Sequence, residues 1–370
     1  MAAAQGVGEL DGHALAGFIE AEGSFGIVPN NRGRTWVCAM TLNQRADDAD
    51  MLVDIVRVTG LGRLHAVPAR RTSRPQVVWS VTSKLECREL SRLLRRFPLR
   101  GRKRCEFAVW AAAVDRWSES LYGSNRAADG VLRSSAAELR LLRRYVDRGP
   151  SLVADERDPE PLSAGLSAFL GGFFTGEGSF SLRGKAATSV HLRADDADLL
   201  RIFRDAFGVG RLSVSRPPGV NPSVFWRVCR RADLPHAIAM LDAAVLRGRK
   251  RREFEAWRLG AAEYARGRDR DPEVIAAAAQ SLAQARAYVE RAVVLPTYGS
   301  ATEAYIDVLR AFADELPDGK LTCTAYGHAR ERHPEWPTRN TLALAFGSWE
   351  QALAAAGLGA RASAWRSARA

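Results

Sequence analysis

The spacing of apolar residues predicts the same order of elements twice along the chain. Helices are expected over about 11–23 and 163–177, each followed by a hairpin whose turn residues lie at 29–33 and 183–185. Asp47 or Asp195 should N-cap a second helix. A second hairpin is expected at 61–81 and 209–228, where Val77, Trp79 and Val81 alternate along a strand with one buried face. Further helices at 85–97, 104–117, 234–245 and 251–264 complete the plan.

Three sequence segments confirm that the chain is duplicated. Leu15 to Phe25 returns as Leu170 to Phe180, Arg45 to Asp50 returns unchanged at 193–198, and Leu99 to Arg104 returns unchanged at 246–251. The offset falls from 155 to 148 residues between the first two segments, so the second copy lacks seven residues in its first hairpin. We therefore expect an α+β fold with two pseudo-symmetric domains.

The predicted domain boundaries follow from the repeats and from breaks in the pattern. Domain one should span residues 1–148, a proline-rich and charged linker 149–161, and domain two 162–295. Helical periodicity continues at 304–316, 322–333 and 339–358, which predicts a small all-α domain over 296–370.

Charge narrows the class of partner. The chain has 54 Lys and Arg against 42 Asp and Glu, a formal net charge of +12, which favours a polyanionic partner.

No apolar stretch approaches the ~20 residues of a membrane span, and the first residues do not resemble a secretory signal, so a cytoplasmic location is expected. Five scattered cysteines indicate neither a disulfide framework nor a zinc site.

Small residues recur every four positions on the repeated helix. They are Gly17 and Ala21 in copy one, and Ala168, Gly172 and Gly176 in copy two. Such a stripe allows two helices to approach closely, and the other copy's helix is the expected partner, although an ordinary helix packed on its own sheet is the alternative.

Glu22 and Glu177 occupy the last turn of these helices, each before a glycine suited to a left-handed cap. Packing the helices around a two-fold axis would bring the two carboxylates together, where protons or divalent cations would have to neutralise them. Oxygen ligands without His or Cys suit Mg²⁺. The alternative is that both are solvated residues with no joint role.

Leu15 to Gly23 and Leu170 to Gly178 resemble the two signature motifs of single-chain LAGLIDADG homing endonucleases. The resemblance implies that the motif helices form the interface between the halves and that antiparallel sheets form a saddle in the DNA major groove. It further implies that Glu22 and Glu177, with the carbonyls of Ala21 and Gly176 as possible helpers, bind the catalytic divalent ions. A bound Mg²⁺ would activate water and produce a staggered double-strand cut.

The resemblance also implies polar and basic groups around the scissile phosphates. By position these are Gln44 and the pairs Arg102-Lys103 and Arg249-Lys250, although a solvated helix start explains the basic pairs equally simply. Copy two departs from the pattern with Leu192 in place of Gln44. Asp48 and Asp196 occupy positions where many relatives have a basic residue. Cleavage at the second half-site is therefore expected to be less efficient.

DNA reading is expected from hairpin residues, since arginine on a β-ribbon can bind guanine bidentately. The candidates are Asn30, Arg32, Arg34, Arg63, His65, Arg70, Arg71 and Arg74 in copy one, and Arg183, Lys185, Arg211, Ser213, Arg216 and Arg227 in copy two. Each competes with the interpretation of a merely solvated side chain. Dissimilar copies imply a non-palindromic site read by a monomer.

The tail is similar to the short helical repeat appended to many homing endonucleases, which implies helix-turn-helix binding to DNA; a structural helical cap is the alternative. Two other functions fit the fold. A transcription regulator would be expected to lose the motif acids, and an RNA maturase that acts on host intron RNA is not separated from a nuclease by any residue.

Overall fold

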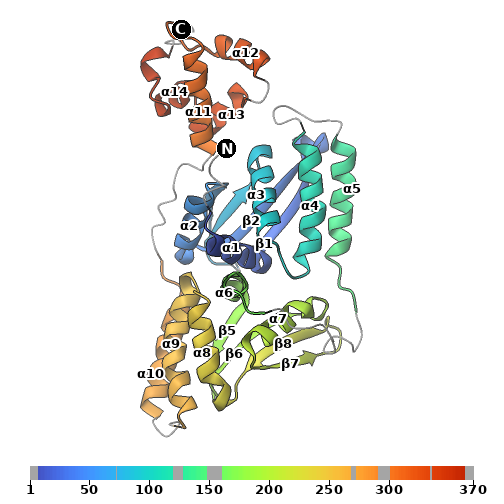
Figure 1. The fold of residues 1–370 in the computed structure, drawn as a ribbon, viewed down its shortest axis with the longest axis vertical. Coiled ribbons are helices and arrows are strands. Elements are labelled where there is room, and N and C mark those ends of the chain that lie inside the picture. The colour runs from blue at the N-terminus through green and yellow to red at the C-terminus, as the bar shows by residue number, and fades with distance from the viewer. Residues whose placement is uncertain are drawn as a thin grey trace.

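A computed structural model describes residues 7–71, 73–119, 128–147, 161–267, 272–290, 301–333 and 336–362. The α+β prediction is confirmed, with two four-stranded antiparallel sheets in the orders β1-β2-β4-β3 and β5-β6-β8-β7 (Figure 1). The elements of copy one are α1 (Glu9–Glu22), β1 (Gly23–Asn30), β2 (Thr35–Arg45), α2 (Asp50–Thr59), β3 (Arg63–Val67), β4 (Gln76–Val81), α3 (Lys84–Arg96), α4 (Lys103–Trp117) and α5 (Asp129–Leu142).

Copy two repeats this order. Its elements are α6 (Ala164–Glu177), β5 (Gly178–Ser181), β6 (Ala187–Arg193), α7 (Ala197–Phe207), β7 (Arg211–Ser215), β8 (Ser223–Val228), α8 (Leu234–Ala243), α9 (Gly248–Ala265) and α10 (Pro272–Arg286). The seven missing residues shorten the first hairpin, as expected, so β5 has four residues where β1 has eight.

One face of each sheet packs on helices. Trp79 of β4 and Trp226 of β8 are fully buried there, and each indole N–H donates to a backbone carbonyl, of Leu61 at 2.8 Å and of Val209 at 3.0 Å. These bonds satisfy the polar edge of a large apolar side chain. The opposite face of each sheet is called the outer face below.

Helices α1 and α6 lie against each other between the two sheets (Figure 1). A Cβ on Gly17 would lie 1.9 Å from the Phe169 carbonyl oxygen, and one on Gly172 would lie 1.9 Å from the Ala14 carbonyl oxygen. Only glycine permits this distance between the backbones. The small-residue stripe therefore joins the two copies.

Two local predictions are wrong. Asp47 and Asp195 do not cap the second helices, because each lies in a short 3-10 turn and α2 and α7 begin only at Asp50 and Ala197. Gly23 and Gly178 are not left-handed caps either, since both adopt extended φ near −70° and −65° and lead directly into a strand. The predicted plan also omitted α5 and α10.

The chain that follows α5 and α10 crosses to the other copy. The Val146 N–H donates to Asp195 at 3.2 Å, and the Val289 N–H donates to Asp47 at 3.1 Å. Each aspartate is buried and also binds the arginine two residues before it. We call residues 143–146 and 286–289 the two straps.

Each strap also carries a tyrosine beneath the same arginine. Arg193 lies 5.6 Å from the Tyr145 ring centre and Arg45 lies 5.4 Å from that of Tyr288. The straps explain why Arg45 to Asp50 recurs unchanged, because its arginine and first aspartate form the receptor for the other copy's strap.

The tail forms a separate apolar core from α11 (Ala301–Asp314), α12 (Cys323–Arg332), α13 (Arg339–Phe346) and α14 (Trp349–Ala355). Phe312, Tyr326 and Trp349 lie at its centre, and the Tyr326 hydroxyl donates to the Pro337 carbonyl at 2.9 Å. The predicted domain boundaries stay predictions, since most of the linker and residues 291–300 lie outside the described residues. Among those described, no helix has the length and apolarity of a membrane span.

Candidate functional site

Glu22 and Glu177 are the last residues of α1 and α6, and the seam between these helices brings them together. A Cβ on Gly176 would lie 2.5 Å from the Ala21 Cβ and 3.3 Å from the Glu22 carboxylate, so a larger residue at 176 would disturb Glu22. Desolvation raises the pKa of Glu22. Desolvation, and then the charge of Glu22, raise the pKa of Glu177 to about 7.

The predicted metal ligands fit a hard divalent cation. Both side chains donate only oxygen, and the neighbouring Glu22 charge raises the Glu177 pKa, which a bound cation would reverse. Within the described residues no group of three or more His, Cys, Asp or Glu side chains forms a metal cluster. Water or phosphate oxygens would therefore have to complete the coordination of an ion between these two glutamates.

Lys103 and Lys250 lie beside the two carboxylates. The Lys103 ammonium donates to the carbonyls of Ala21 at 2.8 Å and Ile19 at 3.3 Å, and the Lys250 ammonium donates to the carbonyl of Gly178. Burial lowers the pKa of both lysines, that of Lys250 to about 8, while Glu22 favours the charged form of each. Two cations therefore flank the glutamate pair.

Arg102 and Arg249, the other members of the basic pairs, bind carboxylates within their own helices. Arg102 binds Glu106 at 2.7 Å, and Arg249 binds Glu253. Both glutamates are buried and each receives a second arginine, Arg143 at 2.7 Å and Arg286 at 3.0 Å. These arginines hold α4 and α9 to the straps. The lysine is therefore the member of each pair that lies near the glutamates.

Asp48 and Asp196 have a structural use that the sequence did not reveal. Each is buried and reaches across the seam, where Asp48 accepts the Arg249 N–H at 2.7 Å and Asp196 accepts the Arg102 N–H at 2.9 Å. They anchor the start of the other copy's lysine-bearing helix. Asp48 and Asp196 therefore have a structural role in both halves, which their departure from the family pattern does not reveal.

Gln44 and its counterpart Leu192 are the penultimate residues of β2 and β6, and both are half-buried. Leu192 packs on the apolar core. A catalytic role for Gln44 stays a prediction.

The two sheets carry positive charge without negative charge. None of the strands β1 to β8 contains an aspartate or glutamate, although the chain has 42 of them. Arg63 and His65 lie on the outer face, because they pair with Ser80 and Val78 while the intervening Leu64 pairs with the buried Trp79. The same alternation puts Arg211, Ser213 and Arg227 on the outer face of copy two. This surface suits a polyanion.

The remaining DNA-contact candidates lie at strand ends and turns. Asn30 ends β1 opposite Thr35, and Arg32 occupies the turn in the left-handed region, with φ of 58°. Arg74 lies over the Tyr288 ring at 5.2 Å, and Arg216 approaches Asp147 at 3.9 Å. Exposed positions in turns are also occupied by Arg34, Arg70, Arg71, Arg183 and Lys185.

Sequence reasoning missed an aromatic pair on the outer face of copy two. His191 and Phe225 are cross-strand partners whose rings stack at 4.0 Å with an interplanar angle of 1°. The alternation of β6, with Ser189 and Arg193 on the same face, is a signal that could have revealed His191.

The fold of the two copies is similar to that of solved LAGLIDADG homing endonucleases. The structure is similar to the I-SmaMI LAGLIDADG homing endonuclease bound to cleaved DNA, with 16% identity, a TM-score of 0.58 and coverage of 75% of this chain and 98% of that one. It is also similar to the LAGLIDADG homing endonuclease I-GzeII in complex with its DNA target, at 18% identity, TM-score 0.56 and coverage of 75% and 98%. The LAGLIDADG meganuclease I-AabMI bound to uncleaved DNA is 20% identical, with a TM-score of 0.53 and coverage of 74% of this chain and 96% of that one.

The sequence itself points to the same family. Residues 15–114 match the family model described as LAGLIDADG endonuclease, whereas no protein of curated function matches. The predicted resemblance to LAGLIDADG endonucleases is therefore confirmed, by sequence over residues 15–114 and by fold for both copies. The three structural matches cover about three quarters of the chain. The resemblance of the tail to a DNA-binding repeat stays a prediction.

Proposed function

We propose that the protein is a site-specific homing endonuclease that makes a staggered double-strand cut in DNA by divalent-ion-dependent hydrolysis of phosphodiester bonds. The proposal rests on the proximity of Glu22 and Glu177 at the seam between two sheets whose strands contain no Asp or Glu. The matched I-SmaMI, I-GzeII and I-AabMI structures were each determined with DNA, which supports double-stranded DNA as the substrate.

The residues have distinct roles in the proposed reaction. Glu22 and Glu177, together with the carbonyls of Ala21 and Gly176, would hold the divalent ion, for which Mg²⁺ is the best match to an all-oxygen site. When bound, such an ion lowers the pKa of water and stabilises charge on phosphate oxygens. One related structure contains I-SmaMI with its DNA target in the presence of calcium ions, which supports a divalent-ion requirement.

Lys103 and Lys250 supply positive charge next to the developing negative charge of the phosphate, one on each side of the seam. Their burial makes this charge more effective, because water does not screen it. Arg63, His65, Arg211 and Arg227 on the outer faces contact the DNA grooves and backbone. Since the two outer faces differ, the proposed target is non-palindromic and is read by a monomer.

The two alternative functions use the same fold, but neither requires the glutamate pair to cut DNA. A transcription regulator needs the sheets and no glutamate pair, so the presence of both glutamates favours the nuclease. A maturase would require binding to intron RNA, and none of the described residues specifically indicates RNA.

The test is selection of cleaved duplexes from a randomised target library in the presence of Mg²⁺. We expect the wild-type chain to enrich one long site, and Glu22→Gln and Glu177→Gln each to abolish double-strand cleavage while affinity for the selected duplex in Ca²⁺ changes by less than about tenfold. Glu138→Gln, an exposed change of the same kind on α5, is the matched control and should cut normally. Cleavage by both glutamine variants would remove the assignment of the glutamate pair.

A further inference from the structure

The loop that leads into α4 is held by a buried glutamate of α1. Glu20, which is 4% exposed, accepts the N–H groups of Arg100 at 3.0 Å, Gly101 at 3.0 Å and Lys103 at 3.1 Å. These N–H groups lie at the start of a helix and have no partner within it. One carboxylate thus fixes the backbone from which the Lys103 side chain extends.

The equivalent residue of α6 is Thr175, and its hold on the second loop is weaker. The Thr175 hydroxyl accepts the Arg247 N–H at 3.3 Å and donates to the Gly171 carbonyl at 2.8 Å. One hydroxyl oxygen that accepts a single N–H stands where copy one has two carboxylate oxygens that accept three.

The cross-copy anchors do not explain this difference. Asp196 accepts the Arg102 N–H at 2.9 Å, and Asp48 accepts the Arg249 N–H at 2.7 Å. Both loops therefore have the same backbone contact with the opposite copy, and the Arg247 side chain adds an exposed ion pair with Asp11 of α1. The two loops differ instead in how many backbone N–H groups Glu20 and its counterpart Thr175 accept.

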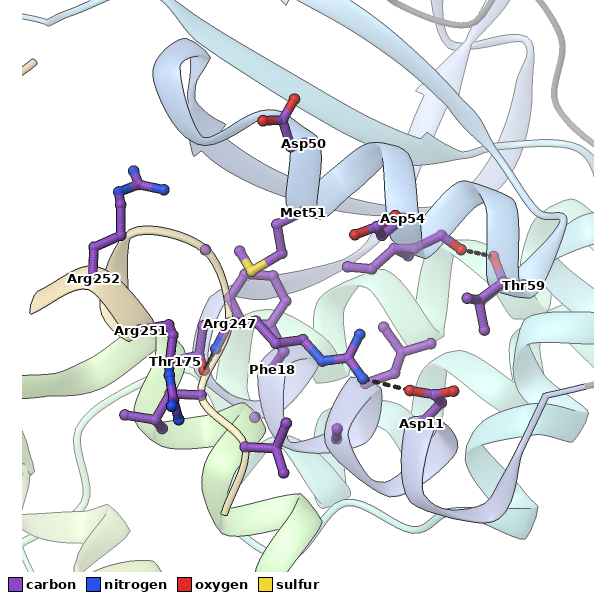
Figure 2. A pocket seen from close by; sticks show the side chains of 18 residues that line it. Asp11, Phe18, Asp50, Met51, Asp54, Thr59, Thr175, Arg247, Arg251 and Arg252 are labelled. Carbon is purple, nitrogen blue, oxygen red and sulfur yellow. Dashed lines mark hydrogen bonds and ion pairs between the residues drawn. The ribbon is translucent and has the colours of Figure 1, made fainter. Parts of the chain in front are cut away.

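Packing beside the two loops differs in the same direction. The Arg100 guanidinium lies over the buried Phe169 ring at 5.5 Å. By the repeat, Ala14 is the counterpart of Phe169, and beside it lies a cavity of about 440 Å³ lined by Ala14, Met51, Thr175 and Arg247 among others (Figure 2). The loop before Lys103 is thus packed against an aromatic ring, whereas the loop before Lys250 borders a cavity.

We propose that Glu20 is a positioning residue that fixes Lys103 more firmly than Thr175 fixes Lys250, so that the two DNA strands are cut at unequal rates. The proposal rests on the proposed function. A preorganised cation stabilises the transition state without having to be ordered during the reaction, so the half-site served by Lys103 cuts its strand first.

The test is Glu20→Thr in the full chain, which gives copy one the residue of copy two. The substrate is the duplex recovered from the library selection, with each strand labelled separately. We expect the wild type to nick one strand faster, and Glu20→Thr to slow that strand by about tenfold or more while the other strand changes by less than about twofold. Glu20→Gln retains one accepting oxygen and should recover part of the rate.

General destabilisation would slow both strands alike, so an equal loss of rate on the two strands, or an unchanged strand ratio, would overturn the proposal. Amide hydrogen exchange without DNA gives an independent readout. We expect Gly101 and Lys103 to exchange more slowly than Gly248 and Lys250, and Glu20→Thr to remove the difference. A wild type that cuts neither strand would count against the proposed function, whereas equal exchange at the two loops would count against Glu20 as a positioning residue.

Discussion

At the scale of single residues, the glutamate pair could be predicted from the sequence but its electrostatics could not. The repeated motif identifies Glu22 and Glu177 as equivalent. Their desolvation and mutual repulsion depend on how closely α1 and α6 approach, which no pattern in one copy specifies. The same holds for Lys103 and Lys250, because only the structure shows that the arginine beside each lysine is occupied by a buried glutamate.

The raised pKa of Glu177 predicts a pH-dependent response to Mg²⁺. A carboxyl whose pKa is about 7 in the folded protein holds its proton more tightly than in the unfolded chain, so this contribution to stability is lost as the pH rises from the ordinary carboxyl range through about 7. Mg²⁺ binds the deprotonated form. We expect saturating Mg²⁺ to raise the melting temperature clearly at pH 8 and much less at pH 6.

Glu177→Gln is the matched variant for this measurement. Without divalent ions at pH 8 it should melt at a higher temperature than the wild type, by about 2 °C or more, because it removes one of two like charges. It should also lose the response to Mg²⁺. An equal Mg²⁺ response in both proteins at pH 8 would show that the ion binds elsewhere.

At the scale of elements, the stripe of small residues predicted the α1/α6 seam, and the apolar spacing predicted both hairpins of each copy. It failed where an element depends on distant partners. Helix α5 buries Leu132, Ala136 and Leu139 at helical spacing, a signal present in the sequence, yet its link to α4 through Arg143 and Glu106 joins residues 37 positions apart. In the sequence Asp47 precedes a helical pattern and therefore resembles a helix cap. Its partner in the structure, the Val289 N–H, lies 242 residues away along the chain.

The seam predicts a sharp contrast between two glycine substitutions. Gly17→Ala places a Cβ 1.9 Å from the Phe169 carbonyl oxygen and forces the helices apart, so we expect it to lower the free energy of unfolding by at least about 2 kcal/mol. Gly130→Ala in α5 has no atom within 4 Å of the new Cβ and should raise that free energy by about 0.5–1 kcal/mol. Urea unfolding measures both, and equal values would contradict the close seam.

At the scale of the whole molecule, the net charge of +12 indicated a polyanionic partner, but composition could not show where the charge lies. The structure shows strands free of carboxylates, with the acidic residues in helices, turns and connections. The outer faces of the two sheets therefore present basic side chains such as Arg63, Arg211 and Arg227 with no carboxylate on the strands themselves.

This distribution predicts the salt dependence of DNA binding. Arg211→Gln with Arg227→Gln removes two positive charges from the outer face of copy two and should weaken binding and reduce the slope of log K against log salt by about 1–2. Arg57→Gln with Arg92→Gln removes the same charge from exposed positions on α2 and α3. Filter binding between 50 and 200 mM salt compares them, and similar slopes for both double variants would contradict a DNA surface on the sheets.

The crossed straps have a consequence for recombining halves of such proteins. Residues 143–146 belong to copy one by sequence, but their receptor is Arg193 and Asp195 of copy two, and residues 286–289 have the inverse relation. In a hybrid that joins one half of this chain to a half from a relative, the strap of each half has to bind the receptor of the other half. Its junction is therefore compatible only when the donor half supplies both a tyrosine-bearing strap and an arginine-aspartate receptor that match the half it joins.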